Sequence, residues 1–318
     1  MSKHHRNRNW APAPQPLPED AHVIDNHTHV ASVVPFSQAM SHEAMEKGQG
    51  EVPVYSVDEL LEQAQKVGVE GVIDCGCELP NLMTAIDMAR EHPGTVHAAI
   101  AIHPNEAVLH GHRGAPGPDG LPIKYKPWHD IPFDEAMAEV HRLATTYPNQ
   151  VVAIGETGMD LFRTGESAKE LQREAFRAHI ALAKELNLPM QIHDRDSHKE
   201  VIETLLADGA PEHTVFHSYS GDAEMGEIAR ENGWYLSLSG TSSYKGNDGI
   251  RESAKLVGMS HVMVETDAPY LSPMPYRGRT NAPYMIPYTL QALADYLDRS
   301  LAEIAKATRN TTRVVYGI

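Results

Sequence analysis

The sequence predicts an α/β protein in which one parallel sheet closes into a single (β/α)8 barrel, the TIM-barrel architecture. Two observations lead to this prediction. From residue 22 onward, eight short apolar segments alternate with helix-like amphipathic stretches. These segments are almost continuously apolar, which is typical of parallel strands that are buried on both faces. An open, doubly wound sheet is the alternative, but no glycine-rich phosphate loop follows the first segment.

The eight expected strands are residues 22–27, 71–76, 96–103, 151–156, 189–193, 214–218, 235–239 and 261–267. Helices are expected between them, among others at 56–68, 133–147 and 167–187. The first of these helices begins with Ser56, has Glu59 three residues later and ends at Gly68. Such residues are typical of a capping box followed by a helix stop.

Two stretches interrupt this alternation, residues 31–55 and the Gly- and Pro-rich residues 107–131. Each follows an expected strand, on the side of the barrel where enzymes of this fold build their sites. We expect them to be lids or substrate-contacting loops, with plain surface insertions as the alternative.

Composition limits the class of protein. The chain has 318 residues, 41% of them hydrophobic, and a net charge of −16, so a broad basic surface for nucleic acid is excluded. Its two cysteines, Cys75 and Cys77, argue against a disulfide framework and suit a reducing cytoplasm. No apolar run is long enough to span a membrane. We expect a cytoplasmic protein with no obligate protein partner, in which a flexible Pro-rich tail (1–21) precedes one domain (22–318).

Polar residues end five of the expected strands. His27 and His29 are two positions apart, so both rings face the same side of the first strand. Taken singly, each such residue is an ordinary strand-end polar group, but barrel closure brings all of them to one mouth. Four histidines and two carboxylates exceed the ligands of one tetrahedral ion, which predicts two divalent metals (Zn, Mg or Mn) sharing one carboxylate. The six residues are His27, His29, Glu156, His193, His217 and Asp267.

Five motifs resemble those of the TatD-type metal-dependent deoxyribonucleases of the amidohydrolase superfamily: "DNHTHV", "IGETGMDLF", "QIHDRD", "FHSYSG" and "VETDAPYLSP". The resemblance runs from about residue 23 to the C-terminus and implies a (β/α)8 metal-dependent hydrolase. Carried over to this sequence, it implies a first metal held by His27, His29 and Asp267. It implies a second metal held by His193 and His217, with Glu156 bridging the two.

The sequence departs from the family pattern at two places. Asn105 follows His103 and Pro104, where the family usually has His-Pro-His. Arg279, Thr280 and Ala282 stand where a Lys, an Arg and a Glu are frequent, so one cationic position is lost.

The expected reaction is hydrolysis of DNA phosphodiester bonds from strand ends by a metal-activated water. Asp267 is the expected general base, and His103 is a candidate donor to the substrate or leaving group. Arg195 and Arg279 are candidate phosphate contacts because guanidinium groups match phosphate oxygens. Tyr219 is a candidate to stack on a base or sugar. The expected substrate is DNA or a small phosphodiester, and the alternative is a carbonyl compound such as an amide, lactone or aminoacyl ester.

Overall fold

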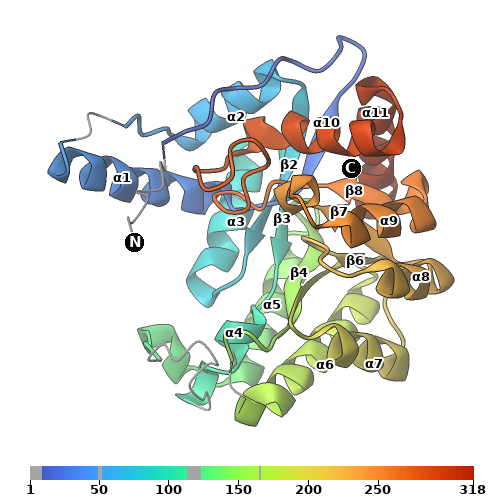
Figure 1. Cartoon of the computed structure of the whole chain (residues 1–318). Coiled ribbons are helices and arrows are strands. Elements are labelled where there is room, and N and C mark those ends of the chain that lie inside the picture. The colour runs from blue at the N-terminus through green and yellow to red at the C-terminus, as the bar shows by residue number, and fades with distance from the viewer. Residues whose placement is uncertain (1–8, 49–51, 113–122, 165) are drawn as a thin grey trace, which may run out of the picture.

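The computed structural model describes residues 9–48, 52–112, 123–164 and 166–318. Its centre is a sheet of eight parallel strands that pair in chain order from β1 to β8 (Figure 1). The strands are β1 (Val23–Thr28), β2 (Val69–Gly76), β3 (Val96–Ile100), β4 (Val151–Asp160), β5 (Met190–Arg195), β6 (Thr214–Phe216), β7 (Tyr235–Leu238) and β8 (Val262–Val264). Just beyond β8, the Asp267 amide donates to the His27 carbonyl oxygen at 3.0 Å, which joins the last strand to the first. The predicted (β/α)8 barrel is confirmed.

Helices alternate with the strands and surround the barrel (Figure 1). They are α1 (Val30–Glu46), α2 (Val57–Lys66), α3 (Leu79–Glu91), α4 (Pro104–Ala107), α5 (Phe133–Thr146), α6 (Lys169–Leu186), α7 (His198–Asp208), α8 (Ala223–Asn232), α9 (Asp248–Val257), α10 (Ile286–Leu297) and α11 (Leu301–Tyr316). The capping box of α2 is present, because the Ser56 hydroxyl accepts from the Glu59 amide and the Glu59 carboxylate accepts from the Ser56 amide. Over the described ranges, no helix has the length and apolar character needed to cross a bilayer.

The barrel interior is filled with side chains from strands on opposite sides. Ile73 of β2, Ala99 of β3, Val215 of β6 and Met263 of β8 form one buried cluster. Tyr316, at the end of α11, belongs to the same cluster and closes the interior below the functional end of the barrel. Because this interior is packed, no site can form inside it, and barrels of this kind build their sites at the mouth, at the carboxyl ends of the strands.

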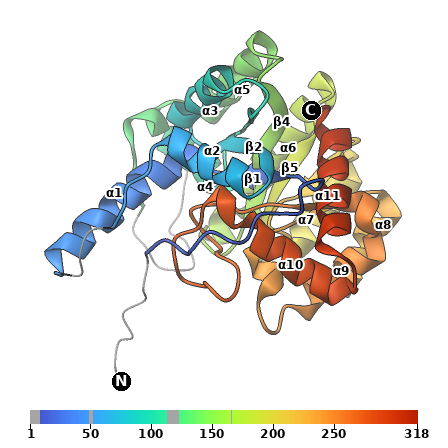
Figure 2. The same ribbon diagram turned by 90° about the horizontal axis from the view of Figure 1, so that it is seen from above.

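The two interruptions of the alternation have different outcomes. Most of the expected connection at 31–55 is helix, since α1 occupies residues 30–46 and extends away from the barrel (Figures 1 and 2). Of the second stretch, residues 113–122 lie outside the described residues, so its expected role as a lid stays a prediction.

The segment before β1 runs across the molecule between α1 and α11 (Figure 2). Residues 1–8 lie outside the described part of the chain. Ala11 and Leu17 are buried, and Trp10 pairs with Thr280 in an isolated parallel bridge. The expectation of a flexible tail is therefore wrong for residues 10–17, because their apolar side chains and backbone groups are engaged by the barrel domain.

Candidate metal centre

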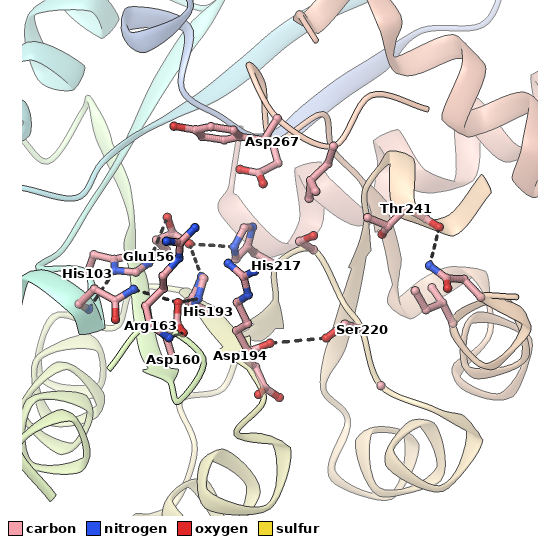
Figure 3. Close-up of a pocket in the computed structure, with 18 of the residues that line it drawn as sticks. His103, Glu156, Asp160, Arg163, His193, Asp194, His217, Ser220, Thr241 and Asp267 are labelled. Atoms are coloured by element: carbon pink, nitrogen blue, oxygen red, sulfur yellow. Dashed lines mark hydrogen bonds and ion pairs between the residues drawn. The ribbon is translucent and has the colours of Figure 1, made fainter. Parts of the chain in front are cut away.

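All six predicted metal ligands lie together at the mouth of the barrel. Five of them line a cavity of about 870 Å³, together with His103, Asp160 and Arg195 (Figure 3). The sixth, His27, is fully buried and does not line the cavity. The order of the barrel explains the convergence: His27, Glu156 and His193 lie in β1, β4 and β5, while His29, His217 and Asp267 follow the carboxyl ends of β1, β6 and β8, and closure of the barrel brings these ends to one mouth.

Glu156 is placed between two groups of histidines. Its Oε1 lies 3.7 Å from His29 Nε2, while its Oε2 lies 3.1 Å from His193 Nδ1 and 2.8 Å from His217 Nε2. Asp267 lies on the side of His29, with Oδ1 3.5 Å from His29 Nε2 and 3.9 Å from His27 Nε2. A carboxylate whose two oxygens face separate ligand groups is suited to bridge two divalent ions.

The hydrogen bonds of the histidines leave nitrogen lone pairs for metals. His27 Nδ1 lies 2.8 Å from Gln191 Oε1, so this nitrogen carries the proton and Nε2 keeps its lone pair. Among the described residues, the buried His27 Nε2 has no hydrogen-bond partner. An unpaired buried nitrogen is costly unless a cation occupies the place in front of it, so the donor set fits a divalent metal.

Two other histidines are oriented in the same manner. His29 Nδ1 lies 3.1 Å from the Cys75 carbonyl oxygen, and His217 Nδ1 lies 3.1 Å from Glu265 Oε1. Each contact fixes the proton on Nδ1 and leaves Nε2 to face Glu156 or Asp267. Such partners orient the ring and make it a better ligand.

Sequence reasoning missed Gln191 and Glu265, although a signal was present. Gln191 precedes His193 by two positions within β5, so both face the same side of that strand, and Glu265 directly follows the apolar residues of β8. Gln191 Nε2 donates to the Asn26 carbonyl oxygen at 2.8 Å and to the Tyr316 hydroxyl at 3.0 Å. With the amide nitrogen fixed in this way, its oxygen must point at His27.

The pKa shifts of the centre indicate that Glu156 is charged and His27 is neutral at neutral pH. Burial favours a raised pKa for Glu156, but His217, His103 and His193 outweigh it and hold this pKa well below the usual range. Burial and the neighbouring His217 lower the pKa of His27, which keeps that ring neutral and able to coordinate. Glu156 is therefore ionised at neutral pH, as a bridging ligand must be.

His103 lies beside this centre, in the place that the sequence predicted. Its Nδ1 accepts a hydrogen bond from the backbone amide of Asn105 at 3.0 Å, so the proton of the ring is on Nε2. This Nε2 lies 4.0 Å from Glu156 Oε1. Burial and the charge of His193 lower the pKa of His103 to about 4. The ring is therefore a neutral hydrogen-bond donor at neutral pH. Asn105, where the family usually has histidine, donates to Asp160 Oδ2 at 2.9 Å, and Asp160 Oδ2 lies 3.2 Å from His193 Nε2.

The three expected substrate contacts are placed differently from one another. Arg195 lines the cavity, with its guanidinium carbon 4.1 Å from the centre of the Phe162 ring. Arg279 is not among the residues that line the cavity, and its Nη1 donates to the Trp10 carbonyl oxygen at 3.1 Å. Tyr219 is only 2% exposed, and its hydroxyl donates to the Asp222 carbonyl oxygen at 3.0 Å. The prediction that Tyr219 stacks on a substrate is wrong, because the ring is enclosed in the core.

Comparisons with known proteins agree with this geometry. The family described as TatD related DNase matches residues 24–317. The chain is 37% identical over 267 residues to an uncharacterized metal-dependent hydrolase, TatD, of Mycobacterium tuberculosis, which covers 83% of this chain and 92% of the relative. It is 30% identical over 263 residues to the uncharacterized metal-dependent hydrolase YabD of Bacillus subtilis, covering 82% and 93% of the two chains.

Solved structures show the same fold. The TatD homolog YJJV of Escherichia coli superposes with a TM-score of 0.73 at 23% identity, over 94% of this chain and 99% of the other. An N-acetyl-D-glucosamine-6-phosphate deacetylase of Mycobacterium smegmatis superposes with a TM-score of 0.55 at 12% identity, over 94% and 76% of the two chains. The barrel, the converging ligands and the match over residues 24–317 lead to one conclusion. The chain belongs to the TatD-related DNase family of metal-dependent hydrolases.

Proposed function

We propose that this hydrolase uses two divalent ions to cleave phosphodiester bonds of DNA, starting from strand ends. The observation that carries the proposal is the position of Glu156, whose two oxygens face separate histidine groups. His27, His29 and Asp267 would hold one ion, and His193 and His217 the other. Divalent ions in such a pair lower the pKa of water and stabilise negative charge on phosphate oxygens.

The protein's own groups have distinct tasks in this reaction. Asp267 accepts the proton of the attacking water, because its carboxylate lies at the cavity and the nearby His27 and His29 hold their protons on Nδ1. His103 donates a hydrogen bond from Nε2 to the substrate or the leaving oxygen. Its neutral state at pH 7 suits a donor that does not give its proton away completely.

A cation–aromatic stack at the rim supplies a place for a phosphate group. Arg195 lies over Phe162, and Arg163 lies 5.6 Å from the centre of the same ring. Both arginines line the cavity, and Phe162 is 37% exposed. Stacking holds the Arg195 guanidinium plane while its N–H edges stay able to bind phosphate oxygens. This stack is the local basic patch that a chain with a net charge of −16 needs in order to bind a polyanion.

A carbonyl substrate is the second candidate. Asp194 and Asp222 line the same cavity, and their negative charges oppose a polyanion. A small amide, lactone or aminoacyl ester does not meet that repulsion. The Arg195 stack favours the phosphodiester, because a guanidinium group matches phosphate oxygens.

The decisive experiment gives the metal-loaded protein end-labelled single-stranded DNA, a simple phosphodiester and a panel of amides and esters. We expect release of mononucleotides from the DNA and no turnover of the amides. Arg195→Gln should raise KM for DNA and make its salt dependence shallower by about 0.7 in log–log slope, the change for one lost phosphate contact.

The matched control is Arg177→Gln, since Arg177 pairs with Asp208 on the surface and does not line the cavity. This control should behave as wild type. Efficient cleavage of an amide or ester without cleavage of DNA would replace the proposal by the second candidate.

A further inference from the structure

We infer that residues 10–17 form a strap that positions the loop between β8 and α10 (residues 265–285), and through this loop the Asp267 carboxylate. The inference rests on the metal centre of the proposed function, but it does not depend on which bond the enzyme cleaves. The strap lies before residue 24, where the match to the family begins. It therefore lies outside the residues that match the family.

Trp10 fixes the start of the strap. Its indole Nε1 donates to the Pro53 carbonyl oxygen at 2.7 Å, and its ring lies 5.0 Å from the ring of Tyr55. The same ring packs against a small buried cluster formed by Met40, Ala44 and Val52. Trp10 thereby joins α1 to the segment that leads into α2.

The strap also holds the far limb of the β8–α10 loop. Trp10 pairs with Thr280, and its carbonyl oxygen accepts from Arg279 Nη1 at 3.1 Å. Tyr284 donates its hydroxyl to the Ala11 carbonyl oxygen at 2.7 Å, and Tyr288 donates to the Pro12 carbonyl oxygen at 3.2 Å. Three contacts, through Arg279, Thr280 and Tyr284, therefore fix this limb against the strap, and the contact of Tyr288 fixes the first turn of α10.

Asn281, which directly follows the clamped residues, carries the restraint to Asp267. This side chain is fully buried, and its Nδ2 donates to the Thr266 carbonyl oxygen at 2.8 Å and to the Tyr270 carbonyl oxygen at 2.6 Å. Its backbone amide donates to the Pro269 carbonyl oxygen at 3.1 Å. The bonds reach residues on both sides of Asp267.

Asp267 needs such support because its backbone has φ +53°. Residues other than glycine keep this left-handed conformation only where the surrounding structure determines it. Arg279 is, in this view, an anchor of the strap rather than a phosphate contact, which explains why it does not line the cavity.

The test is the full-length Trp10→Ala variant, with affinity for Co²⁺ measured by competition with a chelator. We expect affinity to fall by about 10-fold, the lower end of what loss of a ligand's support produces. The visible spectrum of bound Co²⁺ should change, because the Asp267 ligand moves. Trp10→Phe keeps the ring on Tyr55 and should restore most of the affinity.

The matched control is Leu17→Ala, which removes a buried side chain from the other end of the strap. Leu17 packs on Gly68 and its amide donates to Val67, away from the loop. This variant should lower thermal stability but leave Co²⁺ affinity and spectrum unchanged. If Trp10→Ala and Leu17→Ala alter stability alone, or alter affinity equally, the inference is wrong.

Arg279→Ala keeps the question answerable should Trp10→Ala fail to fold. We expect it to weaken Co²⁺ binding and leave the salt dependence of DNA cleavage as in wild type. A shallower salt dependence with normal Co²⁺ binding would instead make Arg279 a phosphate contact and overturn the strap. A wild-type protein that binds Co²⁺ but does not cleave DNA would refute the proposed function and leave this inference intact.

Discussion

Glu156 is the residue on which both halves of the proposed two-metal centre depend. We expect wild type to hold two metal equivalents when fully loaded. Glu156→Gln removes the negative charge and one of the two carboxylate oxygens, so occupancy of both proposed sites should fall together rather than one alone. Elemental analysis after loading and desalting measures this directly. One equivalent or less in fully loaded wild type would contradict a two-metal centre.

Asp267 allows metal binding and proton transfer to be separated. Asp267→Asn keeps the shape and one coordinating oxygen but cannot accept a proton from water at neutral pH. His27 and His29 remain to hold the ion, so metal content should change little. Turnover should fall by at least about 10²-fold, the usual scale for a lost acid–base group. Turnover and metal content should be measured on the same sample. Near-normal turnover of a fully metallated Asn variant would mean that a group other than Asp267 accepts the proton of the attacking water.

At the scale of elements, the eight strands were predictable because burial on both faces makes each one a short apolar run. The residues at which the strands end were less predictable. The last strand was expected to reach residue 267, but β8 ends at Val264, since the chain leaves the ladder before the left-handed Asp267. Helix α1 was not expected, because Pro35 and neighbouring valines disfavour a helix. Its buried face, which includes Val33 and Met40, stabilises it nevertheless.

The same distinction applies to the site. Strand residues such as His193 and Glu156 could be placed from the sequence because alternation fixes the direction in which a strand side chain points. Tyr219 and Arg279 lie in loops, where no such rule holds. Ser218 has φ +41°, and this turn directs Tyr219 into the core instead of the cavity. Arg279 reaches a segment 269 residues earlier, a contact that no local pattern encodes.

For the whole molecule, metal binding is coupled to pH through the histidines. Burial alone would lower the pKa values of His29 and His193. Asp267, Cys75 and Glu156 outweigh burial at His29 and raise its pKa to about 10. Asp160 and Glu156 raise that of His193 to about 9. Without metal, both rings are protonated at pH 7, and a metal must displace these protons.

We therefore expect metal affinity to rise with pH and binding to release protons. The raised pKa values of His29 and His193 also stabilise the metal-free fold. This contribution is fully present below pH 6.5, the ordinary pKa of histidine. It is lost as the pH rises through about 9 to 10, where the two rings lose their protons in the folded protein. Titration calorimetry in two buffers of different ionisation enthalpy measures the released protons. Melting curves should show the metal-free protein losing stability between pH 7 and 10 more steeply than the loaded one. Binding heats that are independent of the buffer would contradict this coupling.

The packed interior of the barrel also determines where a substrate can enter and where a product can leave. Within the part of the chain that the structure describes, Ile73, Val215, Met263 and Tyr316 fill the axis below the ligands. Nothing can be threaded through the barrel, so the mouth is at once entrance and exit. A product therefore has to dissociate through the mouth of the barrel before the next substrate molecule can bind. Product and substrate therefore compete for the same opening, and slow dissociation of the product delays binding of the next substrate.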